Sequence, residues 1–333
     1  PWMTTREVPS SSKARCETRS QKTKPFTMSK IKQVLSVRKP HGHDKLQLAC
    51  DPFFVLYDAR SGSTFLADLL MRTGSVCIPP ESNIVTQLLS QWRGRPIENL
   101  SELKHISSVA FEDPKLADWG LSEGQVEKAL KRKLPLCLSD FLMEVFALYR
   151  VVHGGEGAVF GIKKGSYLEF SSEIDALFPR SKYICLIRDG RAVFCSKRRS
   201  VHSAWNRPLE TDVGAAARQW VRAVRLIRSL EDKLPARTLV LHYEKLVQNV
   251  DTVVADILEF LDVEEGAHTL ENGQRYRVSE RYGTIHSNVG KPPDHSRISA
   301  WRAELTAAEV EEYEAIAGER LIAEGYEIVS RSV

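Results

Sequence analysis

Short apolar runs followed by helical patterns recur along most of this 333-residue chain. The run FFVLY at 53–57 precedes a small-residue turn, and apolar residues then repeat at helical spacing from Phe65 to Leu70. The same pairing of strand and helix returns at three later runs, which are 159–162, 183–187 and 238–243. Strands that alternate with helices pair in parallel through right-handed crossovers. The sequence therefore predicts an α/β fold with three layers, in which a central parallel sheet carries helices on both faces.

Two stretches interrupt this alternation. Residues 84–150 carry helical patterns only, and an insertion between sheet strands commonly covers a site, so we expect a helical cap insertion. Residues 266–302 are polar and contain Pro292–Pro293, which is typical of a long loop that is either functional or disordered. An amphipathic helix is expected from Ala307 to Ala323. We expect one folded domain over 51–333.

The first fifty residues differ in charge from the rest of the chain. Residues 1–50 carry a formal charge of +8, whereas the remainder carries −4. This basic stretch is interpreted as a disordered leader, an organelle transit peptide, or sequence upstream of a start at Met28. It lacks interleaved aromatic residues, so we expect no nucleic-acid partner.

Composition excludes several other classes of function. No apolar run approaches eighteen residues, so we expect neither a membrane-spanning helix nor a secretory signal. The six cysteines contain no CxxC pair and the nine histidines lack ligand spacing, which favours reduced thiols and no metal site. A cytoplasmic location is expected, with organelle targeting through the leader as the alternative.

The loop after the first strand has the composition of an anion site. The segment DARSGST at 58–64 places small and hydroxyl residues between a buried strand and a helix N-terminus. The Walker pattern is absent, because its first glycine is missing and Ser63 stands where its lysine would be. Arg60 is the only cation of this loop. The alternative is a plain tight turn between strand and helix.

A second motif follows the strand at 183–187. Arg188 stands at the carboxyl end of that strand, where a guanidinium can bind a phosphate through two parallel hydrogen bonds. Ser196 lies about two helical turns further on, where its hydroxyl can share the same phosphate. The alternative is an Arg–Asp pair that caps the next helix.

Together these motifs resemble the superfamily of sulfotransferases that use 3'-phosphoadenylyl sulfate (PAPS). RSGST resembles the arginine version of its 5'-phosphosulfate loop, which is found in bacterial, carbohydrate and tyrosylprotein members, and IRDGRAVFCS at 187–196 resembles its 3'-phosphate motif. The resemblance extends over about residues 52–330 and implies a P-loop-like fold. The cofactor contacts that it implies are Arg60, Ser61, Gly62, Ser63, Thr64, Arg188, Ser196, Arg297 and Trp301. The loop before Trp301 lacks the glycine that the family usually carries.

The resemblance also implies which residues perform the chemistry. Arg60 and Lys163 correspond to the cations that stabilise charge on the transferred group, and an error of one position would make the second of these Lys164. Glu81 follows Arg60 at the separation seen in members with a glutamate base, and its alternative role is a charge in the first turn of a helix. The leaving phosphate of PAP is a stable anion, so no metal is required.

The expected reaction is in-line transfer of a sulfuryl group from PAPS to a hydroxyl acceptor. A carbohydrate or glycolipid hydroxyl is the first expectation for this small-molecule or glycan acceptor, and a phenol or peptide tyrosine is the second. A P-loop nucleotide kinase is disfavoured by the absent Walker lysine. A non-catalytic protein that binds PAP or another nucleotide is disfavoured by the joint presence of Arg60, Glu81, Lys163 and Arg188. The oligomeric state is not encoded in any of these motifs.

Overall fold

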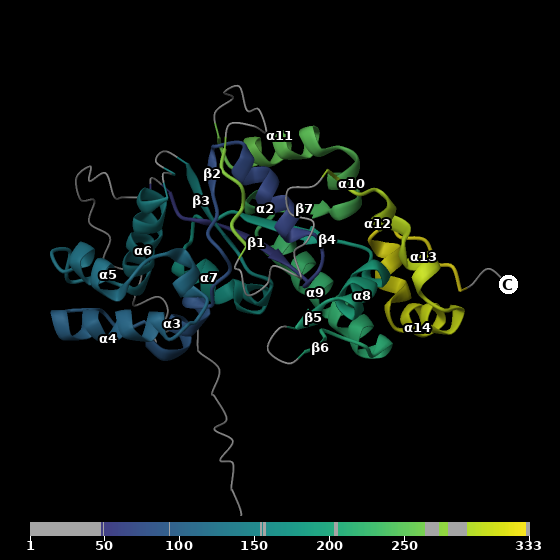
Figure 1. Cartoon of the computed structure of the whole chain (residues 1–333), viewed down its shortest axis with the longest axis horizontal. Helices are drawn as coiled ribbons and strands as arrows, with labels where there is room; N and C mark the ends of the chain where they lie inside the picture. Colours follow the sequence, from purple (N-terminus) through teal and green to yellow (C-terminus); the bar gives the residue numbers. More distant parts are fainter. Residues whose placement is uncertain are drawn as a thin grey trace, which may run out of the picture.

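The structure is a computed structural model of the chain (Figure 1). It describes residues 48, 50–92, 94–153, 155, 158–202, 206–263, 273–278 and 292–330. The expected leader therefore lies outside the described residues, apart from Leu48 and Cys50. Most of the loop expected at 266–302 lies outside them as well.

A parallel sheet forms the centre of the structure, as the sequence predicts. In spatial order its strands are β2 (Val76–Cys77), β3 (Val159–Lys163), β1 (Phe53–Tyr57), β4 (Tyr183–Ile187) and β7 (Thr238–His242). Every neighbouring pair among these strands is parallel. Residues of β1 are buried on both faces, which explains why this strand is an uninterrupted apolar run. A separate antiparallel pair is formed by β5 (Val201–His202) and β6 (Arg207–Pro208).

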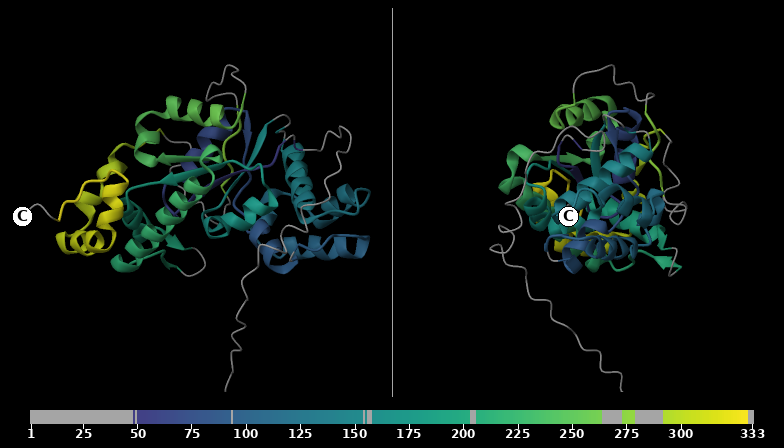
Figure 2. Two further views of the ribbon diagram at one scale, coloured as in Figure 1. Left: turned by 180° about the vertical axis from the view of Figure 1, so that it is seen from behind. Right: turned by 90° about the vertical axis from the view of Figure 1, so that its left-hand side faces the viewer.

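Helices cover both faces of this sheet, which confirms the predicted three-layer fold (Figures 1 and 2). On one face, Phe53 and Val55 pack in a core shared with α2 (Ser63–Arg72), α10 (Tyr243–Gln248) and α11 (Val250–Phe260). On the other face, Phe54 and Leu56 pack in a second core. That core is shared with α7 (Ser171–Leu177), α8 (Gly190–Arg199) and α9 (Val213–Lys233).

The stretch expected to be a helical insertion is helical. It forms α3 (Ile84–Trp92), α4 (Leu100–Phe111), η1 (Leu116–Trp119), α5 (Glu123–Leu130) and α6 (Leu138–Val152). These helices gather at the end of the sheet that carries β2 and β3 (Figure 1). The one residue of this insertion that lines the cavity described below is Lys115, within the described part of the chain.

The C-terminal elements lie at the opposite end of the sheet, beside α8 and α9 (Figures 1 and 2). Two short helices, α12 (Ser296–Ser299) and α13 (Trp301–Glu304), occupy the end of the stretch expected to be a loop. The predicted last helix is α14, and its bounds are Ala307–Ala323. The remaining short elements are η2 (Gly165–Phe170) and η3 (Pro235–Arg237). Among the described helices, none combines the length and the apolar character that crossing a membrane requires.

Candidate active site

The loop between β1 and α2 takes a conformation that suits an anion. Gly62 has a φ of +94° and Arg60 a φ of +74°, so two residues of the loop adopt the left-handed region. Gly62 is also the N-cap residue of α2, and it has no side chain with which to cap the first-turn amides. A Cβ on Gly62 would lie 2.3 Å from the ring of Tyr243. The loop thus requires glycine at this position and leaves helix amides available to a ligand.

A buried ion pair fixes this loop against α8. The ammonium group of Lys197 donates to both carboxylate oxygens of Asp58, at 2.9 and 2.8 Å. The amide of Ser61 donates to the carbonyl of Asp58 at 3.2 Å, which closes the turn. Ser61 itself is buried and does not line the cavity. The loop and the helix that carries Ser196 are therefore held as one unit.

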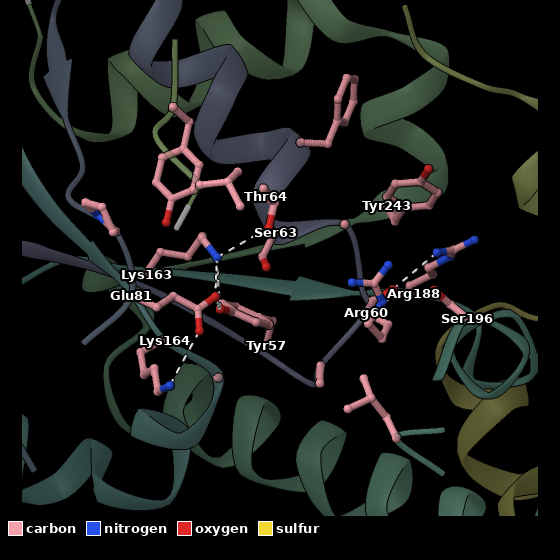
Figure 3. Close-up of a pocket in the computed structure, with 18 of the residues that line it drawn as sticks. Tyr57, Arg60, Ser63, Thr64, Glu81, Lys163, Lys164, Arg188, Ser196 and Tyr243 are labelled. Atoms are coloured by element: carbon pink, nitrogen blue, oxygen red, sulfur yellow. Dashed lines mark hydrogen bonds and ion pairs between the residues drawn. The ribbon is translucent and has the colours of Figure 1, made fainter. Parts of the chain in front are cut away.

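Arg60 and Arg188 lie close together beside this loop (Figure 3), and Arg297 of α12 joins them. Arg60 donates from Nε to the hydroxyl of Ser196 at 3.1 Å. Arg188 donates to the carbonyl oxygens of Arg60, at 3.2 Å, and Arg297, at 2.8 Å. The structure thus brings together four of the residues that the sequence assigned to the cofactor, of which Arg60 and Ser196 alone are 136 positions apart in the chain.

Arg188 is buried at the wall of the cavity. Its guanidinium carbon lies 4.3 Å from the ring centroid of Tyr243, and its side chain is largely buried. Its Nε has no hydrogen-bond partner among the described residues. A buried donor without a partner is costly, so this atom favours a ligand that accepts a hydrogen bond.

Arg60 and Arg188 of this basic cluster have lowered pKa values. Burial lowers the pKa of Arg60 to about 10, and the neighbouring Arg188, Arg297 and Arg199 contribute to the shift. Burial also lowers the pKa of Arg188. Both guanidinium groups remain protonated at neutral pH, so the cluster presents concentrated positive charge. An anion bound there would relieve the mutual repulsion.

A second cluster surrounds Glu81 on the β3 side of the cavity (Figure 3). Lys163 forms an ion pair with Glu81 through Oε1. Tyr57 donates its hydroxyl to the same oxygen at 2.6 Å, and Lys164 lies 3.5 Å from Oε2. Lys163 also donates to the hydroxyls of Tyr57, at 3.2 Å, and Thr64, at 3.5 Å. The side chain of Glu81 is 30% exposed, whereas that of Lys163 is 1% exposed.

These contacts set the ionisation of Glu81. Burial by itself would raise the pKa of this carboxyl, but Lys163, Lys164 and the hydrogen bond from Tyr57 outweigh burial and hold the pKa well below its usual range. Burial lowers the pKa of Lys163, while Glu81 opposes that shift. Glu81 is thus ionised at neutral pH and can accept a proton once its lysine partners are engaged elsewhere.

Lys163 and Lys164 both reach Glu81, which differs from the alternation expected along a strand. β3 ends at Lys163, and Lys164 lies beyond it, so alternation does not fix its direction. Lys163 is more deeply buried and contacts Thr64, which belongs to the segment 58–64. We call this segment the phosphate loop. Lys164 has a 10% exposed side chain and lies 3.5 Å from the other oxygen of Glu81, Oε2.

Both clusters line one cavity of about 400 Å³. The lining includes most of the residues that the sequence assigns to the site, namely Arg60, Gly62, Ser63, Thr64, Glu81, Lys163, Arg188, Ser196 and Arg297. Trp301 lies outside this lining, because its ring packs on the guanidinium of Arg191, whose carbon is 3.8 Å from the ring centroid. Arg191 in turn binds Asp189 and Glu314, so Trp301 supports the start of α8.

Tyr276 and Tyr57 complete the site and were not assigned from the sequence. The described segment 273–278 runs along α2, where the amide of Tyr276 donates to Asp68 at 3.1 Å and its hydroxyl donates to the carbonyl of Pro79 at 3.3 Å. Lys163 lies 5.3 Å from the ring centroid of Tyr276. Tyr276 follows no strand or motif, so no local pattern could identify it. Tyr57 is the last residue of the strand before the loop, and this position is the sequence signal by which it could have been identified.

The arrangement combines an anion-binding end and a carboxylate end within one cavity. The first can bind phosphate groups through guanidinium groups and helix amides. The second can remove a proton and stabilise developing negative charge with ammonium groups. Over the described ranges, no three His, Cys, Asp or Glu side chains are placed to hold a metal ion together.

Comparison with known proteins supports this interpretation. The sequence model of the sulfotransferase family matches residues 52–266. Protein-tyrosine sulfotransferase A of Caenorhabditis elegans is 24% identical over 242 residues, covering 69% of this chain and 54% of that protein. The Drosophila melanogaster protein-tyrosine sulfotransferase is 23% identical over 214 residues, covering 61% of this chain and 36% of that protein. This chain spans about half or less of the length of these two relatives.

A solved structure shares the fold. The sulfotransferase domain from the curacin biosynthetic pathway superposes with a TM-score of 0.56 at 20% identity, covering 85% of this chain and all of that one. At this identity the likeness establishes the fold alone. The family match covers most of the chain and includes the phosphate loop, Glu81, Lys163, Arg188 and Ser196. The chain therefore belongs to the sulfotransferase family.

Proposed function

We propose that this chain transfers a sulfuryl group from PAPS to a hydroxyl group of an acceptor. The observation that carries the proposal is the joint lining of one cavity by the basic cluster around Arg188 and the carboxylate cluster around Glu81. Sulfuryl transfer needs both functions, because one end must hold a doubly phosphorylated nucleotide while the other activates the acceptor.

The residues present fit PAPS. The first-turn amides of α2 and the glycine at position 62 suit the 5'-phosphosulfate. The Nε of Arg188, which has no hydrogen-bond partner within the described ranges, suits the 3'-phosphate. Ser196 and Arg297 lie beside Arg188 and would share that phosphate. When bound, PAPS supplies an activated sulfuryl group.

The carboxylate cluster would perform the proton transfer. Glu81 accepts the proton of the acceptor hydroxyl, and this raises the nucleophilicity of the oxygen. Lys163 lies between Glu81 and Thr64 of the phosphate loop, so its ammonium group can serve the transferred group and the base in turn. Arg60 contributes positive charge from the other side of the loop.

The acceptor is proposed at the level of its class. Pro80, Lys115, Ser166 and Tyr276 line the cavity around Glu81 and leave this end able to admit a hydroxyl. A carbohydrate or glycolipid hydroxyl is our first proposal. A peptide tyrosine is the second candidate, which is supported by the names of the curated relatives.

The first experiment tests nucleotide choice by thermal shift with PAP, ATP and AMP, each with and without magnesium. We expect PAP to raise the melting temperature most, with no need for magnesium, because Arg188 and Ser196 recognise a 3'-phosphate. A magnesium-dependent preference for ATP would instead indicate a nucleotide kinase.

The second experiment tests transfer directly. Labelled PAPS is incubated with the protein and a panel of sugars, glycolipids, phenols and tyrosine peptides, and the sulfated product is identified by mass spectrometry. We expect label in a hydroxyl acceptor of one class. PAP binding without transfer to any acceptor class would favour the non-catalytic nucleotide-binding alternative.

A further inference from the structure

The hydroxyl of Tyr57 lies between the two charged residues of the carboxylate cluster. Tyr57 ends β1 and is 5% exposed. Its hydroxyl donates to Oε1 of Glu81 at 2.6 Å and accepts a hydrogen bond from Nζ of Lys163 at 3.2 Å. A tyrosine hydroxyl has one proton to donate, and here that proton is directed to the carboxylate. Tyr57 therefore joins the proposed base to the lysine beside it.

The two oxygens of Glu81 consequently differ. Oε1 receives both the Tyr57 hydroxyl and the Lys163 ammonium group. Among the described residues, Oε2 has one contact, which is Lys164 at 3.5 Å. Each carboxylate oxygen offers about two lone-pair sites, so two donors occupy Oε1 and Oε2 keeps the capacity to accept a proton.

We propose that Tyr57 is a positioning residue for Glu81, because its hydroxyl and Lys163 occupy Oε1 and leave Oε2 as the oxygen that takes the proton of the acceptor hydroxyl. This inference rests on the proposed function, in which Glu81 is the base. The proton passes from the acceptor hydroxyl to Oε2, and the acceptor oxygen keeps the electron pair with which it bonds to sulfur. The bond between sulfur and the 5'-phosphate oxygen breaks in the same transfer, and its electron pair leaves with PAP. The proposal assigns a role to a residue outside both phosphate motifs.

The surroundings of Tyr57 hold its side chain in this place. A Cβ on Gly165 would lie 2.8 Å from the carbonyl oxygen of Tyr57 and 3.2 Å from its ring, so the turn after β3 packs directly on this residue. Burial and the negative charge of Glu81 raise the pKa of Tyr57 well above its usual value. The hydroxyl therefore stays protonated through neutral pH and remains a donor to the carboxylate.

Sheet register explains why the contact forms. Val55 of β1 pairs with Lys163 of β3, and Tyr57 lies two residues further along β1. Residues two apart on a strand point to the same face, so Tyr57 and Lys163 emerge near one another at the carboxyl edge of the sheet. Glu81 enters from the segment after β2, which is the other neighbour of β3.

The test is a double-mutant cycle with the full chain, comprising the wild type, Tyr57→Phe, Glu81→Gln and the double variant. Tyr57→Phe keeps the ring and removes the hydrogen bond to a charged group, so single-turnover rates at saturating labelled PAPS should fall roughly ten- to a hundred-fold. In the Glu81→Gln background the same change should lower the rate less than about twofold, because the carboxylate is already absent.

Two further measurements separate positioning from general damage. Tyr57→Phe should leave PAP affinity within about twofold, since the phosphate ligands lie in the other cluster. Tyr57→Phe should also lower the melting temperature less in the Glu81→Gln background than in the wild type, as it does for the rate. Tyr183→Phe is the matched control, because Tyr183 is a buried tyrosine of β4 whose hydroxyl contacts Asp175 at 3.4 Å, and its turnover should be unchanged.

The outcomes distinguish this inference from the proposed function. If Tyr57→Phe lowers the rate equally in the wild-type and Glu81→Gln backgrounds, or lowers it in neither, the role of Tyr57 is overturned. The base assignment still stands in that case, provided that Glu81→Gln alone is slow. If Glu81→Gln turns over as fast as the wild type, or the wild type sulfates no acceptor, the base assignment fails and the inference fails with it.

Discussion

Lys163 and Glu81 form an ion pair at the carboxyl edge of the sheet, although 82 positions separate them in the chain. The lysine is almost fully buried and the carboxylate is partly exposed to the cavity. A buried ammonium group needs a nearby anion, and here the anion is the side chain proposed to remove the acceptor proton. The proposed proton transfer and local stability therefore depend on the same contact.

Replacing Glu81 by glutamine should separate these two roles. The amide keeps the size of the side chain but has no basicity, so single-turnover rates should fall roughly a hundred- to ten-thousand-fold. PAP affinity, measured by calorimetry, should change little. Glu144→Gln is the matched control, because Glu144 forms a pair with Lys133 at 2.9 Å outside the cavity lining. Near-normal turnover in Glu81→Gln would remove this residue from the mechanism.

The variants Lys163→Met and Lys164→Met should change different kinetic constants. Lys163 contacts both Glu81 and the phosphate loop, so its loss should lower kcat roughly a hundred- to a thousand-fold. Lys164 lies 3.5 Å from Oε2 of Glu81, so its loss should act mainly on the KM of the acceptor. Steady-state kinetics with both substrates varied provide the comparison. Equal losses of kcat in the two variants would contradict the assignment.

Arg188→Ala should weaken PAP binding without unfolding the protein. Hydrogen bonds to a charged phosphate are worth roughly 1.5–3 kcal/mol, which corresponds to about ten- to a hundred-fold in affinity. Isothermal titration with PAP and with AMP makes the measurement, and the loss should be confined to PAP because AMP lacks the 3'-phosphate. Arg180→Ala is the control, since Arg180 is 66% exposed and lies outside the cavity lining. Equal affinity of Arg188→Ala and wild type for PAP would refute the phosphate assignment.

Gly62→Ala tests the shape of the phosphate loop. The added Cβ would lie 2.3 Å from the ring of Tyr243, and alanine at a φ of +94° is strained as well. We expect a lower melting temperature together with at least about tenfold weaker PAP binding, because the loop must move to relieve the clash. Gly325→Ala is the matched control, because Gly325 has a φ of +83° with no atom within 4 Å of its Cβ position. That variant should lose stability from strain and keep its PAP affinity, and a Gly62→Ala variant with normal affinity would contradict the prediction.

The surroundings of Glu324 should make the stability of the protein depend on pH. Burial would raise the pKa of this carboxyl, but the His242 ring at 3.4 Å and the Arg228 guanidinium lower it to about 2 from a usual 4.5. A depressed folded-state pKa stabilises the protein above pH 4.5, and this contribution is lost as the pH falls towards 2. Glu324→Gln should therefore cost up to about 3 kcal/mol of unfolding free energy at pH 7.

The measurement is urea denaturation of the wild type and Glu324→Gln at several pH values between 7 and 3. The difference between the two proteins should be constant from pH 7 to about 5 and shrink below that. Glu319→Gln on α14 is the control, because Glu319 is exposed. A difference that stays constant down to pH 3 would show that ionisation of Glu324 is not its source.

Much of the fold and the anion end of the site could be predicted from the sequence because their signals are local. The apolar run of β1, the glycine of the loop and the periodicity of α2 all lie within twenty consecutive residues. Arg188 and Ser196 likewise stand on one strand end and the helix that follows it. Ligands of parallel sheets bind at the carboxyl ends of the strands, so these positions indicate a site before any packing is known.

The carboxylate end of the site was decided by tertiary structure. Strand order places β3 between β1 and β2, and the register of Val55 with Lys163 brings that lysine beside Tyr57. Tyr276 arrives from a segment without regular structure and joins the site through Asp68 and the Pro79 carbonyl. Such contacts depend on strand order, register and side-chain packing between segments far apart in the chain, and local periodicity encodes none of these. The residue types at Glu81 and Lys163 could be identified from the sequence, but their shared contact with Tyr57 exists only in the folded chain.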